Sequence, residues 1–160
     1  MVKLFGHLAL FIFAMGFRNK LLILLFSVVL LLPLACQQPS DLAMVTEVID
    51  GDTIVIDGGY HVRYIGIDAP ESGELYYSEA KRTNEDLVAG KKVRLESDIS
   101  DKDSYGRLLR YVYVGDNFVN AEMVSRGCAW AVAYPPDVKY QVYLEAMENE
   151  ARQKGLGFWR

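Results

Sequence analysis

One short segment, residues 63–71, limits what this chain can fold into. Its sequence, RYIGIDAPE, places Arg63, Asp68 and Glu71 around the apolar run Tyr-Ile-Gly-Ile, which predicts a buried strand. Another acid, Asp52, lies upstream in an Asp-Gly-Asp turn. Carboxylates held close together repel each other, and a divalent cation between them removes that cost. Oxygen ligands suit Ca²⁺ or Mg²⁺, and an arginine on the same strand suggests a phosphate beside the metal.

The first 35 residues have the composition of a secretory signal. They contain three basic residues and no acidic one, and residues 21–32 form an almost unbroken aliphatic run. A basic start followed by an apolar run and small residues is typical of a cleaved signal peptide. We therefore expect residues 1–35 to be a signal peptide. The sequence after Met15 would itself make a normal basic start, so Met15 is an alternative first residue.

Cys36 follows Leu-Ala and resembles the lipidated cysteine of bacterial lipoproteins. The resemblance implies an exported, membrane-anchored lipoprotein of the cell envelope, with residues 36–42 as the lipidated cysteine and a tether. Pro33 stands where such motifs usually carry Leu, which leaves a secreted protein or an uncleaved anchor as alternatives. The apolar run is short for a membrane span of about 20 residues, which disfavours the uncleaved anchor.

The charge of the mature chain excludes broad electrostatic binding of nucleic acid. Without residues 1–35 it has 14 basic residues, the 17 of the full chain less Lys3, Arg18 and Lys20, against 21 acidic ones, a net charge of −7. Proteins that hold nucleic acid by general charge are basic. A phosphodiester substrate would have to be held locally, by a metal ion and a few arginines.

The hydrophobic pattern predicts a small barrel with helices. Short strands separated by turn residues, interleaved with about three helices, favour a five-stranded barrel of the OB type. Ser78 is the expected cap of the first helix. The expected strands are residues 43–49, 53–57, 60–67, 91–96 and 107–114, with a further short one at 128–133, and the expected helices are 79–89, 119–126 and 138–154.

Several separate motifs, in order, resemble the staphylococcal nuclease (thermonuclease) family. They are VIDGDT from residue 48, VRYIGIDAPE from 62, DSYGRLLRY from 103, VNAEMVSRG from 119 and a terminal GFW. The match spans about residues 44–159 and so covers the mature domain, residues 43–160. It implies an OB-fold barrel with helices, and a monomeric Ca²⁺-dependent enzyme that hydrolyses DNA and RNA without sequence specificity.

The resemblance also implies roles for individual residues. The metal would be held by Asp52, Asp68 and the backbone carbonyl of Ala69, where the staphylococcal enzyme has Thr. Glu71 would act as the general base, or else as an outer ligand of the metal.

Two arginines would bind the scissile phosphate. Arg63 lies inside an apolar strand, where an unpaired guanidinium is costly, so the alternative for it is a structural ion pair. Arg107 follows Tyr-Gly and would otherwise be a solvated turn residue. Tyr105 and Tyr134 would line the nucleotide site. Ser104 replaces a lysine of the family, so one phosphate contact is expected to be missing.

A second class of function is compatible with the same sequence. The acidic net charge and the missing lysine suit a catalytically silent nuclease-like barrel that binds nucleic acid or a protein partner. Such a protein would be expected to lose the acids or arginines of the site, and this chain keeps them all.

Overall fold

Residues 41–160 are described here, from a computed structural model. The predicted signal peptide, the alternative start at Met15 and the predicted lipidation site Cys36 lie outside these residues and stay predictions. Within residues 41–160 no helix has both the length and the apolar character needed to cross a membrane.

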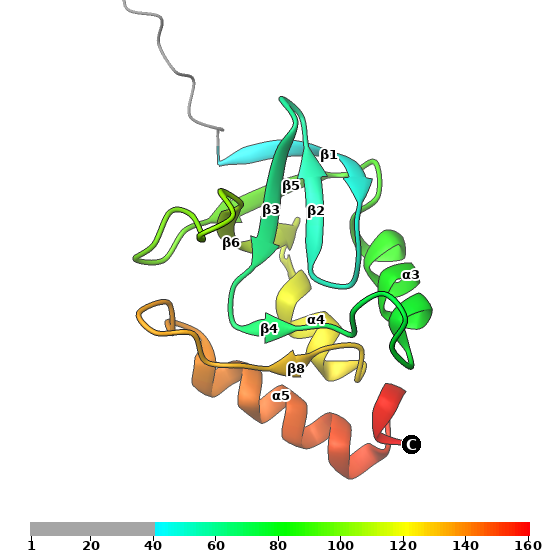
Figure 1. Ribbon diagram of the computed structural model, residues 1–160. Helices are drawn as coiled ribbons and strands as arrows, with labels where there is room; N and C mark the ends of the chain where they lie inside the picture. The colour runs from blue at the N-terminus through cyan, green and yellow to red at the C-terminus, as the bar shows by residue number, and fades with distance from the viewer. Residues whose placement is uncertain (1–40) are drawn as a thin grey trace, which may run out of the picture. The chain divides into compact units, whose positions relative to one another are not determined.

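Five strands form a closed barrel, as the sequence predicts (Figure 1). The order around the sheet is β3-β2-β1-β5-β6, and β3 pairs with β6 to close it. That closing pair is parallel, while the other neighbours are antiparallel. The five strands are β1 (Leu42–Val48), β2 (Thr53–Ile56), β3 (Tyr60–Tyr64), β5 (Lys92–Glu96) and β6 (Leu108–Val114).

Strand β1 pairs with two neighbouring strands because it is bent. Its first half, residues 42–44, pairs with β5, and its second half, residues 45–48, pairs with β2. The register shifts between Val45 and Glu47, a bulge of the kind that bends a strand. The bend lets one strand turn the corner of a small barrel.

A second, two-stranded sheet lies beside the barrel and carries part of the site. It consists of β4 (Ile67–Asp68) and β8 (Trp130–Ala131), with Asp68 opposite Trp130. Figure 1 shows this pair between the barrel and α5 (Gln141–Lys154). A short strand, β7 (Asn117–Phe118), extends the main sheet beyond β6.

Within residues 41–160 three helices accompany the strands, as predicted. Besides α5 they are α3 (Tyr77–Val88) and α4 (Val119–Ser125), and a 3-10 turn, η1 (Gly157–Trp159), ends the chain. The main core cluster is drawn from the barrel and all three of these helices; its fully buried members include Ile54, Ile56, Val62, Val88, Val93, Val112, Met123 and Leu144. The barrel strands therefore have a rigid interior behind the site.

Two local predictions are wrong. Residues 64–67 are buried but are not one strand, because β3 ends at Tyr64 and the chain turns at Gly66, whose φ of 79° favours glycine. Ser78 does not cap α3. The helix begins at Tyr77, and Tyr76 holds the cap position in a left-handed conformation without a side-chain cap bond.

Candidate active site

A cleft of about 380 Å³ opens at one end of the closing pair β3–β6. Six of the predicted site residues line it: Arg63, Asp68, Glu71, Tyr105, Arg107 and Tyr134. The other two predicted site residues in this part of the chain, Asp52 and Ala69, are buried beside it, each with 3% of its surface exposed.

The register of the barrel brings the two arginines together. Arg63 lies on β3 opposite Leu109 of β6, and Val62 lies opposite Leu108. Side chains alternate between the two faces of a strand, so Val62 and Leu108 face the core while Arg63 and Leu109 face the cleft. Arg107, two residues before Leu109, lies on the same side and lines the same cleft.

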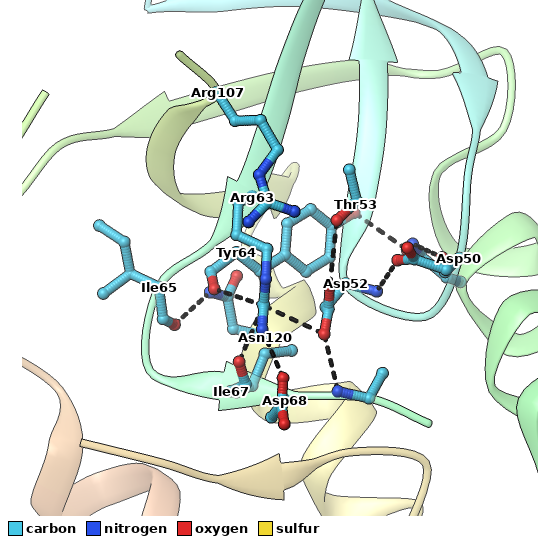
Figure 2. A network of polar contacts seen from close by, with 12 residues as sticks. Asp50, Asp52, Thr53, Arg63, Tyr64, Ile65, Ile67, Asp68, Arg107 and Asn120 are labelled. Carbon is cyan, nitrogen blue, oxygen red and sulfur yellow. Dashed lines mark hydrogen bonds and ion pairs between the residues drawn. The ribbon is translucent and has the colours of Figure 1, made fainter. Parts of the chain in front are cut away.

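The guanidinium of Arg63 is held at several points (Figure 2). Its Nη1 donates to the carbonyl oxygens of Tyr64 at 3.0 Å and Ile67 at 2.8 Å. Its Nη2 donates to Asp68 Oδ1 at 2.7 Å, and Nη1 lies 3.1 Å from Asp52 Oδ2. The ion pair considered as an alternative for Arg63 is therefore present, and its two partners are the predicted metal ligands.

Asp52 is fixed by short-range contacts at the start of β2. Its Oδ1 accepts the hydroxyl of Thr53 at 3.0 Å, its Oδ2 accepts the amide of Ala69 at 2.7 Å, and its own amide donates to Asp50 at 2.9 Å. Burial raises the pKa of Asp52 to about 7, even though the positive charge of Arg63 acts in the opposite direction. A carboxylate in this position needs more positive charge than one arginine supplies.

The donors around Asp52 and Asp68 fit a hard divalent cation with few protein ligands. No three acidic, histidine or cysteine side chains gather into a metal cluster anywhere in residues 41–160. The third predicted ligand is the carbonyl of Ala69, whose amide is bonded to Asp52. When both carboxylates are ionised they share the single charge of Arg63, and the group then has a net negative charge. Oxygen-only donors of this kind leave most of a calcium shell to water and substrate.

A buried amide that sequence reasoning missed fixes the turn between Arg63 and Asp68. Asn120 of α4 accepts a hydrogen bond from the amide of Val112 on β6 at 2.9 Å. It also donates to the carbonyl of Ile65 at 2.9 Å (Figure 2). The position is fully buried, and buried amides need such partners. An asparagine within the apolar face of a short helix was the sequence feature that could have predicted this contact.

Arg107 is held by a residue that sequence reasoning also missed. Asp103 Oδ2 accepts the Nε of Arg107 at 2.6 Å, and Oδ1 accepts the amides of Tyr105 and Arg107 at 2.9 Å each. Burial raises the pKa of Asp103, but the hydrogen bonds and the charge of Arg107 outweigh it and leave the pKa below its ordinary value. Its i,i+4 spacing to Arg107 was a readable signal.

Glu71 is exposed at the edge of the cleft, directly after β4 and Pro70. Its amide donates to Glu74 Oε2 at 2.8 Å, and the amide of Glu74 donates back to the Glu71 carbonyl at 2.9 Å. These two bonds close a tight turn. The backbone of Glu71 is therefore fixed while its carboxylate is open to solvent and substrate.

The two predicted nucleotide-site tyrosines lie in the same cleft. Tyr105 is 85% exposed and lies beside Arg107, whose guanidinium carbon is 5.5 Å from the ring centre. Tyr134 is half exposed and precedes the Pro135–Pro136 turn. Burial and the charge of Asp68 raise the pKa of Tyr134. Both rings are placed to contact a bound group.

Comparison with known proteins agrees with this geometry. The family described as staphylococcal nuclease homologue matches residues 61–160. A thermonuclease of Staphylococcus intermedius is 39% identical over 125 residues, covering 72% of this chain and 74% of that protein.

Two further relatives come from other genera. An endonuclease of Haemophilus influenzae is 38% identical over 129 residues (78% of this chain, 70% of that protein), and a micrococcal nuclease of Shigella flexneri is 36% identical over 130 residues (72% and 71%). With a family match over residues 61–160 and this extent of identity, the chain belongs to the staphylococcal nuclease family.

Proposed function

We propose that this protein is a Ca²⁺-dependent nuclease that hydrolyses phosphodiester bonds of DNA, RNA or both without sequence specificity. The observation that carries the proposal is the meeting of two arginines, two exposed tyrosines, Asp68 and Glu71 in one cleft beside buried Asp52. Relatives named thermonuclease and endonuclease support it. The proposed roles of these residues need no contact with the edges of the bases, which suits cleavage of any sequence.

Asp52, Asp68 and the carbonyl of Ala69 are the proposed calcium ligands. Calcium bound there would act as a Lewis acid on a phosphate oxygen. The net negative charge left after pairing with Arg63 favours a cation at this point. A phosphate would then compete with Asp68 for the Nη2 of Arg63, while Nη1 stays bonded to the carbonyls of Tyr64 and Ile67.

The other side chains of the cleft have separate roles in binding the phosphate, activating water and holding a base. Arg63 and Arg107 donate to the phosphate oxygens, on which negative charge grows as water attacks phosphorus. Groups aimed in advance at developing charge are typically worth about 10²–10³-fold each. Glu71 accepts a proton from the attacking water or orients it, a role worth roughly 10²–10⁴-fold. Tyr105 offers an exposed ring for a base to stack on, and stacking is tolerant of sequence.

We further propose that the protein acts at the cell envelope. The signal-like residues 1–35 and the lipoprotein-like Cys36 support export and anchoring. Fatty-acid labelling of the wild type and of Cys36→Ser, in the host cell, tests the anchor. Absence of label from the wild type would remove Cys36 from that role and would leave a secreted protein or an uncleaved anchor as the alternatives.

A gel containing DNA tests the enzymatic proposal directly. We expect clearing with Ca²⁺ and none after chelation, and Glu71→Gln should lower kcat about 10²–10⁴-fold with little change in KM. Glu74→Gln is a matched control, because it also removes an acid from the same loop while its side-chain oxygen can still accept the Glu71 amide. No clearing by the wild type in calcium would instead support a silent nucleic-acid-binding barrel.

A further inference from the structure

A second hollow continues from the cleft along the β2–β3 hairpin. Its volume is about 320 Å³, and Tyr105 and Arg107 line both this hollow and the catalytic cleft. The other lining residues are Gly59, Tyr60, His61 and Gly106. The exposed Tyr105 therefore borders both the cleft and this hollow.

The barrel register places His61 in line with the site. Along β3, Tyr60, Val62 and Tyr64 turn toward the core while His61 and Arg63 turn outward, because neighbouring side chains alternate. Two residues of a strand span about 6.6 Å, a distance comparable to that covered by one nucleotide. Since Val62 lies opposite Leu108 in the parallel pair, one step back places His61 beside Arg107.

The hollow is suited to an anionic, close-fitting chain. Its six lining residues include no acid, although the domain around it is acidic. His61 is exposed and offers a ring N–H, and Arg107 offers its guanidinium. Gly59 and Gly106 both have positive φ, and a Cβ at either would meet no atom within 4 Å. The space in front of both glycines is open, so a ligand backbone can approach them closely.

We propose that this hollow is a second nucleic-acid subsite, which holds the nucleotide next to the cleaved phosphodiester. The nucleic-acid strand passes over the Tyr105 ring. His61 donates a hydrogen bond to a phosphate or a base of the nucleotide in the hollow. The proposal rests on the proposed nuclease function and adds a dependence on substrate length. Substrates that extend past Tyr105 should have a lower KM than a dinucleotide.

The test compares kcat and KM of the full chain, with calcium, on a DNA dinucleotide and on a longer single-stranded oligonucleotide. In the wild type kcat/KM should be higher for the longer substrate. His61→Ala should reduce that gain roughly 3- to 10-fold, through KM, because it removes one hydrogen bond to a charged or polar group. Lys92→Gln on β5 lines neither hollow and removes a positive charge, so it should keep the wild-type gain.

A charge placed in the hollow gives an independent test. Gly59→Asp adds a carboxylate where the strand should pass, and Asp tolerates a left-handed backbone. Gly115→Asp is the matched control, since Gly115 also lies in a hairpin turn with positive φ and open space. Gly59→Asp alone should raise KM for the longer substrate, and more so at low salt.

The outcomes separate the two proposals. Failure of the wild type to cleave either substrate would overturn the nuclease function itself. Cleavage with no gain from length, or with the full gain kept in His61→Ala, would overturn the subsite alone. An equal effect of the two glycine variants would do the same.

Discussion

The contact between Asp103 and Arg107 predicts a variant that weakens catalysis without touching substrate. Asp103→Asn keeps an oxygen for the amides of Tyr105 and Arg107 but removes the negative charge that faces the Arg107 Nε at 2.6 Å. Asp103→Ala removes all three bonds. Comparing the two variants separates the effect of losing the turn's hydrogen bonds from the effect of losing the orientation of the Arg107 guanidinium.

The expected magnitudes follow from burial and bond type. A charged hydrogen bond contributes about 1.5–3 kcal/mol when sheltered and a neutral one about 1 kcal/mol. The Arg107 side chain is 32% exposed and that of Asp103 16%, so solvent screening reduces the charged contact to about 1 kcal/mol. Asp103→Asn should lower the free energy of unfolding by about 1 kcal/mol and Asp103→Ala by about 3 kcal/mol.

The rate should respond more than the stability. A guanidinium freed from Asp103 spends less time aimed at the phosphate, and complete loss of such a group is typically worth about 10²–10³-fold. We expect Asp103→Asn to lower kcat about ten-fold, a fraction of that range. Urea denaturation and steady-state cleavage of DNA measure the two effects on the same preparations.

A matched control and a double-mutant cycle decide the cause. Asp101 pairs with Arg110 at 2.6 Å but is 57% exposed and lies outside the cleft, so Asp101→Asn should change neither quantity much. In an Arg107→Ala background, Asp103→Asn should cost little further rate, because the group it positions is already gone. A full ten-fold loss in that background would refute the positioning role.

Two further predictions concern stability. Burial raises the pKa of Asp52 to about 7, so the native state binds the proton of this carboxyl more tightly than the unfolded chain does between about pH 4 and 7. The free energy of unfolding gained from this proton is complete below that window and is lost as pH rises through it. In urea titrations with chelator, the wild type should lose roughly 2–4 kcal/mol relative to Asp52→Asn from pH 4 to 8, and parallel pH profiles would contradict the effect of burial. Asn120→Ala leaves the Val112 amide and the Ile65 carbonyl without their partner, and should lower the free energy of unfolding by about 2–4 kcal/mol in urea; a loss under about 1 kcal/mol would show that other groups replace the amide.

The sequence predicts the barrel well because its strands follow from local pattern. Alternating apolar residues locate the strands, and turn residues separate them. The acids and arginines of the site lie in or directly beside these strands, so a correct strand prediction carries most of the site with it. Asp52 at the start of β2 and Arg63 on β3 are examples.

Other features depend on contacts between distant segments and have no local signal. The parallel pairing of β3 with β6 joins residues that are 46 apart in sequence, Val62 and Leu108, and short-range pattern cannot show it. The turn at Gly66 interrupts an apolar run that would otherwise continue as a strand, because Asn120 holds the carbonyl of Ile65. Helix α3 begins without a side-chain cap, so the serine at its start is misleading.

The closing pair β3–β6 determines which measurement best follows the refolding of this protein. The side chains of the cleft are all present in an unfolded chain, yet Arg107 joins Arg63 and Glu71 only once β3 has paired with β6. Slippage by a single residue would swing Arg107 to the opposite side of its strand. Recovered cleavage would therefore report complete, in-register refolding more selectively than a recovered helix signal, because the helix signal does not depend on the register of β3 and β6.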